Sequence, residues 1–125
     1  MAVAFHVKAC TEFSAAHRIE GHPRCGRIHG HNYRVCVTVA EQEPLEVDLD
    51  ELEEWLHREV YMVLDHQYLN EVLSKTTRDL PRVTAEELAE VIAAKLSERF
   101  GERVVAIEVC ETRNLCIEYK PPRRG

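Results

Sequence analysis

The sequence predicts an α+β fold in which two helices cover one face of an antiparallel four-stranded sheet. Apolar and polar residues alternate near both ends of the chain, which is typical of strands that are buried on one face. In the middle of the chain, apolar residues recur at helical spacing in two segments. Each segment starts with a capping-box pattern, so the expected order of elements is ββααββ.

Two strands are expected before the helices. In the first, Val3 and Phe13 belong to one alternating series of apolar residues, and this series ends at His17. After a loop that contains glycine and proline, alternation resumes at His31 and continues to Val39. The two alternating series predict strands that can pair with each other as neighbours.

Two helices are expected next. Asp48 is a good N-cap for the first, and Glu51 lies three residues later, as in a capping box. Thr84 and Glu87 form the same pattern at the start of the second. Gly101 follows the apolar stripe of this second helix and marks its end.

Two strands are expected to close the chain. Alternate residues from Val105 to Glu111 share one face, and residues Leu115 to Tyr119 follow a short turn at Arg113–Asn114. A four-stranded sheet has two open edges, and open edges invite pairing with another chain. We therefore expect a closed oligomer.

Length, composition and charge bound the class of protein. The 125 residues fit one domain over residues 1–125, and 45% apolar with 30% charged residues is typical of a globular chain. The net charge of −6 argues against nucleic acid as a partner. There is no apolar run of roughly 20 residues, as a membrane helix needs, and no signal-peptide pattern. We expect a cytoplasmic protein that does not contact membranes.

Arginine and cysteine show two further patterns. Residues 17–34 contain four arginines and one acidic residue, which fits a small anionic ligand nearby, although for any single arginine a solvated surface charge is the better interpretation. The five cysteines include no CxxC pair. Because no secretion signal is present, we expect these cysteines to be free thiols.

His29 and His31 are the strongest candidates for a metal site. In an extended backbone they project to the same face of a strand, and imidazole nitrogens are good zinc ligands. Gly30 between them lets a ligand approach closely. For this motif alone, a pair of structural histidines at a strand end is an equally good interpretation.

His17 favours a catalytic metal centre. It ends the first strand, so pairing of the two strands would bring three imidazoles together. Three histidines with an open position describe a catalytic zinc site, whereas four protein ligands describe a structural one. Cys25, four residues before His29, fits either role, as a fourth ligand or as a thiolate whose pKa is lowered by Arg24, Arg27 and the metal.

Glu111 and the pair Asp65-His66 are further candidates. Glu111 extends the apolar face of the third strand, where a lone carboxylate is costly. It forms a salt bridge, lies exposed at the strand end, or anchors the guanidine-like edge of a pterin or guanine ring. Asp65 can orient His66 for proton transfer, but adjacent pairs of this kind are common, so the pair alone does not establish a site.

Several short motifs, taken together, resemble those of the 6-pyruvoyl-tetrahydropterin synthase family, which includes the 6-carboxytetrahydropterin synthases. The motifs are Phe13-Ser14-Ala15-Ala16-His17, Cys25-x-x-x-His29-Gly30-His31, Val47-Asp48-Leu49, Leu64-Asp65-His66-x-Tyr68-Leu69-Asn70, Thr84-Ala85-Glu86 and Glu111-Thr112. Each motif alone has low specificity. Their common order and spacing over most of the chain is highly specific.

The resemblance implies an assembly and a set of functional residues. Family members adopt the tunnelling fold (T-fold), in which three ββααββ units form a barrel and two barrels stack into a homohexamer with active sites between subunits. The implied residues are His17, His29 and His31 for Zn²⁺, Cys25 as catalytic base, Asp65 and His66 as proton relay, Glu111 for the pterin ring, and Thr84 and Glu86 near the pterin. A neighbouring subunit can supply the relay.

The resemblance also implies a reaction. The family substrate is 7,8-dihydroneopterin triphosphate. The three residues between Cys25 and His29 resemble the branch that makes 6-carboxy-5,6,7,8-tetrahydropterin, acetaldehyde and triphosphate in queuosine (7-deazaguanine) biosynthesis. The alternative is the biopterin branch, which makes 6-pyruvoyl-tetrahydropterin and has a longer spacing there. Val83 departs from the family, whose members often carry proline at this position.

Two other interpretations do not involve catalysis. A zinc-stabilised module would use Cys25 as a fourth metal ligand, and a pterin- or purine-binding protein would use Glu111 without turning over a substrate. The enzyme is favoured because a binding protein would need neither Cys25 nor the Asp65-His66 pair.

Overall fold

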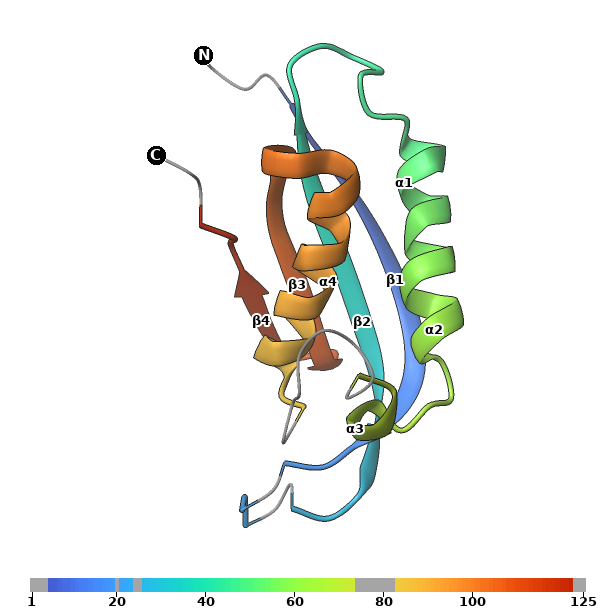
Figure 1. Cartoon of the computed structure of the whole chain (residues 1–125), viewed down its shortest axis with the longest axis vertical. Helices are drawn as coiled ribbons and strands as arrows, with labels where there is room; N and C mark the ends of the chain where they lie inside the picture. Colours follow the sequence, from blue (N-terminus) through green and yellow to red (C-terminus); the bar gives the residue numbers. More distant parts are fainter. Residues whose placement is uncertain (1–4, 20, 24–25, 74–82, 123–125) are drawn as a thin grey trace.

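The computed structural model describes residues 5–19, 21–23, 26–73 and 83–122, and it confirms the expected α+β arrangement (Figure 1). The strands are β1 (Phe5–His17), β2 (His29–Glu41), β3 (Val104–Thr112) and β4 (Leu115–Tyr119). They form one antiparallel sheet in the order β1-β2-β3-β4. Each strand therefore pairs with its neighbour in the sequence.

Helical segments connect β2 to β3. They are α1 (Leu49–Leu56), the π turn η1 (His57–Tyr61), α2 (Met62–Leu64), α3 (Leu69–Val72), α4 (Ala85–Phe100) and the 3₁₀ turn η3 (Gly101–Arg103). The first expected helix is thus a run of α1, η1 and α2, and the short α3 was not predicted. None of the helices in the described segments is long and apolar enough to cross a membrane.

The two predicted helix caps have different outcomes. The capping box of α4 is confirmed, because Thr84 Oγ1 accepts a hydrogen bond from Glu87 N–H and the Glu87 carboxylate accepts one from Thr84 N–H. Asp48 caps α1 by accepting from the N–H two residues later. The predicted box with Glu51 is wrong, because the Glu51 carboxylate pairs with Arg99 of α4. This ion pair joins the two main helices across their exposed surface.

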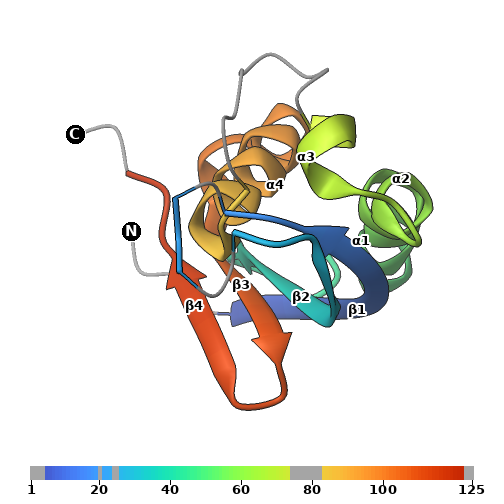
Figure 2. The ribbon, with the colours of Figure 1, turned by 90° about the horizontal axis from the view of Figure 1, so that it is seen from below.

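The helices lie on one face of the sheet and leave the other face open (Figure 2). Odd-numbered residues of β1 and β2, such as Phe13 and Tyr33, are buried in the core beneath the helices, and their rings stack at 5.4 Å. Leu88 and Ile92 of α4 belong to the same core. Burial of one large apolar side chain stabilises a fold by about 2 kcal/mol. The burial of these apolar side chains therefore determines which face of each strand points toward the helices.

The pairing of β1 with β2 is the predicted hairpin-like one. His17 lies opposite His29, and Ala15 lies opposite His31. At the other side of the sheet, the pairing of β3 with β4 shifts just after Cys110 and leaves Glu111 in an irregularity of the β-bulge type. A bulge changes the direction of a side chain relative to the regular alternation.

Four of the five cysteines are paired on the open face of the sheet. Cys10 lies opposite Cys36, Cys110 lies opposite Cys116, and each pair forms a disulfide. The expectation of free thiols is wrong for these four, because direct opposition on neighbouring strands brings the Cα atoms to 4.0 Å. Cys25 lies outside the described residues.

Removal of each disulfide is expected to lower stability according to the length of chain that it closes. Cys10→Ala opens a link across 26 residues and should cost about 3 kcal/mol, whereas Cys116→Ala opens one across 6 residues and should cost about 2 kcal/mol. Both replaced side chains are exposed, so little burial is lost. Urea unfolding of the oxidised proteins measures the difference. Identical stability of the wild type before and after reduction would contradict the prediction.

Candidate active site

Three histidines meet where β1 ends and β2 begins. His17, His29 and His31 each offer one ring nitrogen, and these three atoms all lie within 4.8 Å of one another. The ring centroids are 4.6, 4.9 and 5.0 Å apart. The predicted convergence is confirmed, and the three side chains can hold one metal ion.

Backbone carbonyls orient two of the three rings. His17 Nδ1 donates a hydrogen bond of 2.7 Å to the carbonyl of Val83, just before α4. His29 Nδ1 donates one of the same length to the carbonyl of Arg27. A carbonyl only accepts, so in each ring Nδ1 carries the hydrogen and Nε2 keeps its lone pair. This tautomer is the one that a metal ligand needs, and such outer hydrogen bonds are usual around metal-bound histidines.

The surroundings keep two of the histidines uncharged. Burial lowers the pKa of His17, which is fully buried, and the hydrogen bond to Val83 offsets only part of this effect. Burial also lowers the pKa of His31, against the opposing effect of Glu111. Among the described residues, the Nε2 atoms of His17 and His31 are buried without a hydrogen-bond partner. Buried ring nitrogens without a hydrogen-bond partner fit a metal ion.

Glu111 lies beside these nitrogens. Its Oε2 is 3.0 Å from His31 Nε2 and 3.6 Å from His17 Nε2, although neither contact has hydrogen-bond geometry. The bulge after Cys110 leaves Glu111 outside the regular β3–β4 pairing, and its side chain is 27% exposed. The carboxylate can therefore contact both a ligand in the adjacent hollow and the metal-binding histidines.

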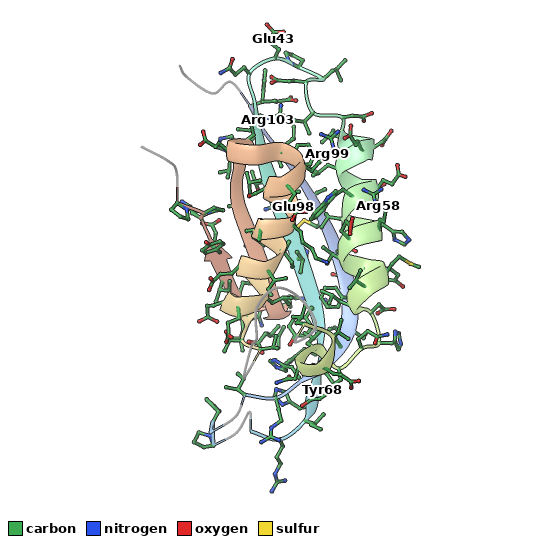
Figure 3. All side chains as sticks on the ribbon, viewed as in Figure 1. Glu43, Arg58, Tyr68, Glu98, Arg99 and Arg103 are labelled. Carbon is green, nitrogen blue, oxygen red and sulfur yellow. A yellow bond between two sulfur atoms is a disulfide. The ribbon has the colours of Figure 1, made fainter. Side chains whose placement is uncertain are left out.

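The Asp65-His66 pair is attached to the edge of β1. Ser14 N–H donates to Asp65 Oδ1 at 3.0 Å, and Ser14 carbonyl accepts from His66 N–H at 2.6 Å. Two residues along, Ala16 forms a β-bridge with Tyr68, which is labelled in Figure 3. The segment that carries the pair is thus held against the same strand that ends in His17.

Asp65 is arranged to keep a charge and to orient His66. The hydrogen bond from Ser14 N–H is the main cause that lowers the pKa of Asp65, and the bond with His66 adds to it. Asp65 Oδ2 lies 2.8 Å from His66 Nδ1, so Nδ1 donates to it and Nε2 is left for proton transfer. His66 has φ of 59°, a left-handed conformation that costs a non-glycine residue about 1 kcal/mol or more. The bond to Ser14 helps to hold this conformation.

Two hollows adjoin residues 30–32, and these three residues line both. One hollow, of about 820 Å³, is also lined by Glu111 and Arg34. The other, of about 480 Å³, is also lined by Ser14 and His66. The predicted pterin anchor and the predicted proton relay therefore face neighbouring spaces that meet at the metal-binding strand.

Two predicted substrate-binding residues are placed elsewhere. The Thr84 hydroxyl is engaged in the cap of α4, and Glu86 is exposed on the first turn of that helix. Neither lines the two hollows beside residues 30–32. Thr84 follows Val83, whose carbonyl accepts the hydrogen bond from His17. Cys25 lies outside the described residues, so its predicted role is untested.

Two contributors were missed from the sequence. Val83 acts through its backbone carbonyl, and no side-chain pattern signals such a contact. Ser14 acts through its backbone and its hydroxyl. Its place three residues before His17, on the edge strand of the sheet, is the signal that could have identified it.

The chain is thus an antiparallel α+β protein in which three converging histidines could hold a metal ion beside an Asp–His pair. Residues 6–122 match the family described as 6-pyruvoyl tetrahydropterin synthase. A Synechocystis protein named 6-carboxy-5,6,7,8-tetrahydropterin synthase is 34% identical over 120 residues, which cover 89% of each chain. The chain belongs to the 6-pyruvoyl tetrahydropterin synthase family and is an enzyme, a lyase like the 6-carboxytetrahydropterin synthases.

Solved structures share the fold. The 6-pyruvoyl tetrahydropterin synthase of Caenorhabditis elegans has a TM-score of 0.79 at 23% identity and covers 98% of this chain and 100% of its own. The Plasmodium falciparum 6-pyruvoyl tetrahydropterin synthase has a TM-score of 0.67 at 17% identity, with coverage of 93% and 98%. The four-stranded antiparallel sheet with its helices on one face is therefore the T-fold unit predicted from the sequence.

Acidification is expected to destabilise the metal-free protein. Below the ordinary histidine pKa of 6.5, the unfolded chain takes up protons at His17 and His31. The folded chain takes them up only at lower pH, because folding lowers the pKa of both histidines. The free energy of unfolding then falls by at most about 1.4 kcal/mol per pH unit for each histidine, and it is insensitive to these groups above that range.

Urea unfolding in the presence of a chelator, from about pH 5 to pH 8, measures this dependence. His31→Gln removes one titrating group and should make the pH dependence shallower. A variant with the same slope as the wild type would show that His31 does not contribute.

Proposed function

We propose that this protein is a zinc-dependent 6-carboxytetrahydropterin synthase. It converts 7,8-dihydroneopterin triphosphate to 6-carboxy-5,6,7,8-tetrahydropterin, acetaldehyde and triphosphate, a step in queuosine (7-deazaguanine) biosynthesis. The observation that carries the proposal is the meeting of three histidines, Glu111 and the Asp65-His66 pair around one end of β1 and β2. The Synechocystis relative bears the name of this activity.

The three histidines would hold the zinc ion through their Nε2 atoms. Zinc suits this donor set, because three imidazoles with an open position are typical of its catalytic sites. When bound, the ion would polarise oxygens on the substrate's side chain and acidify the neighbouring C–H and O–H bonds. The tautomers fixed by Val83 and Arg27 leave the nitrogens of His17 and His29 ready for it.

The chain's own residues bind the substrate and move protons. Glu111 accepts two N–H bonds from the guanidine-like edge of the pterin ring, a geometry that suits a carboxylate. Cys25, as a thiolate, removes a proton from the side chain of the substrate. His66 returns or relays a proton at Nε2, while Asp65 fixes the ring and stabilises its positive charge. The resemblance to the family would also place Thr84 and Glu86 near the pterin, although neither lines the two hollows of this chain.

The choice of product rests on the spacing of one motif. Three residues separate Cys25 from His29, as in the 6-carboxy branch. The second candidate, a 6-pyruvoyl-tetrahydropterin synthase, is favoured by the names of the solved structures that share this fold. The sequence identity to the Synechocystis relative, 34%, makes the 6-carboxy product the first choice.

Assembly would complete the site. The open sheet face and the two edge strands fit a T-fold barrel of three subunits, with two barrels stacked as a homohexamer. In this arrangement a neighbouring subunit closes the hollows beside residues 30–32 and can supply its own Asp65-His66 pair. We further place the enzyme in the cytoplasm, acting on a small pterin without nucleic acid or membrane, as one catalytic domain over residues 1–125.

The first test is to incubate the zinc-loaded protein with 7,8-dihydroneopterin triphosphate and to identify the products by mass. We expect 6-carboxy-5,6,7,8-tetrahydropterin and acetaldehyde in equal amounts. The 6-pyruvoyl product would assign the protein to the other branch. Unchanged substrate in the presence of bound zinc would overturn the proposed reaction.

Two substitutions separate catalysis from metal binding. Cys25→Ala and Asp65→Asn should each lower kcat by about 100-fold or more and keep one zinc per chain, because they remove proton transfer and leave the histidines intact. Asp48→Asn is the matched control, since asparagine caps a helix as well as aspartate does. Loss of zinc and unfolding in Cys25→Ala would instead support a structural zinc module in which Cys25 is the fourth ligand.

A further inference from the structure

Asn32 has no part in the mechanism above, although it follows the metal-binding His31 directly. It lies on the open face of β2, opposite Ser14 of β1. Together with Gly30 and His31 it lines both hollows. A polar side chain at the junction of the two spaces is well placed to contact a ligand that extends from one into the other.

Ser14 fixes the orientation of Asn32. The Ser14 hydroxyl donates a hydrogen bond of 2.7 Å to Asn32 Oδ1. The backbone N–H and carbonyl of Ser14 point to the outer edge of β1, where they hold Asp65 and His66. One residue therefore positions the proton relay through its backbone and Asn32 through its side chain.

This hydrogen bond determines which atom Asn32 presents. With Oδ1 occupied by Ser14, the side-chain amide directs Nδ2 away from that bond. Within the described part of the chain, Nδ2 donates to no other group, and the side chain is exposed. An oriented and unused N–H₂ group is a specific donor for an oxygen atom of a ligand.

Gly30 leaves space next to this donor. A Cβ atom at Gly30 would meet only the carbonyl oxygen of Ala15 at 3.6 Å, which is an ordinary contact, and Gly30 does not have positive φ. The fold alone therefore does not require glycine at this position. Its Cβ would project on the face that Asn32 occupies, so the glycine keeps the path between the two hollows open.

We propose that Asn32 is a substrate-binding residue whose amide, oriented by Ser14, donates a hydrogen bond to an oxygen on the side chain of the pterin substrate. The inference rests on the proposed function. A pterin ring held at Glu111 would extend its side chain past His31 toward His66, and the donor of Asn32 lies along this route. The hydrogen bond would select pterins that carry a polar side chain over those that lack one.

The test compares two ligands and two substitutions in the zinc-loaded protein. The ligands are 7,8-dihydroneopterin, which carries the side-chain hydroxyls, and 7,8-dihydropterin, which lacks the side chain; neither has a triphosphate. Asn32→Asp keeps an acceptor for Ser14 but replaces the donor by an oxygen. It should weaken the calorimetric affinity for 7,8-dihydroneopterin by about 10-fold or more and leave that for 7,8-dihydropterin unchanged.

Ser14 provides the second, matched comparison. Ser14→Ala keeps the backbone bonds to Asp65 and His66 but frees Asn32, and it should weaken binding of 7,8-dihydroneopterin by about 5-fold. Ser14→Thr keeps the hydroxyl and suits a strand, so it should restore wild-type affinity. Thr38→Ser, on the same face of β2 but outside both hollows, is the control.

The outcomes separate this inference from the proposed function. If Asn32→Asp loses affinity for 7,8-dihydroneopterin only, with zinc content unchanged, the role of Asn32 is supported. An equal change in affinity for both ligands, or no change for either, would overturn the role of Asn32 even where the wild type turns over its substrate. If the wild type binds neither pterin and also leaves 7,8-dihydroneopterin triphosphate unchanged, the proposed function fails and the inference fails with it.

Discussion

The register of β1 on β2 is the constraint on which both the core and the site depend. In this register Phe13 and Tyr33 stack beneath the helices, and the buried His17 and half-buried His31 lie on the same face of their strands. A slip by one residue would turn these side chains to the open face. Exposure of the core would cost about 2 kcal/mol for each large apolar side chain. The apolar parts of the strands therefore hold the three histidines together without the help of a metal ion.

The outer edge of β1 links the histidine cluster to the Asp65-His66 pair. Ser14 belongs to an edge strand, so its backbone N–H and carbonyl have no second strand to pair with. Asp65 and His66 satisfy both groups, and Asp65 keeps its charge as a result. The same contacts that close the edge also fix the distance between the pair and the strand that ends in His17. Stability of the fold and geometry of the site thus rest on shared hydrogen bonds.

The sequence was most informative where local periodicity sets the structure. The strands, the cap at Thr84 and the convergence of His17, His29 and His31 all follow from alternation, spacing and one pairing. The sequence was less informative about contacts between residues that are far apart in the chain. The disulfides depend on which strand positions lie opposite each other.

Glu111 shows a second limit of local pattern. Alternation along β3 places its side chain on the inner face, and the carboxylate does lie there, but the histidines that it contacts belong to β1 and β2 and could not be identified from the pattern of β3 alone. The partner of Glu51 is likewise a residue of another helix, Arg99, and not its neighbour in the capping pattern. In both cases the contact joins residues that are distant in the chain.

The carbonyl groups that orient His17 and His29 have a consequence for evolution. Every residue has a backbone carbonyl, so an exchange of the side chain at position 83 or 27 leaves the oxygen in place. Valine at position 83 therefore makes the contact to His17 as any other residue with the same backbone path would. The direction in which these two histidine rings point is protected from point mutation at positions 83 and 27, and only a change in the path of the main chain would alter it.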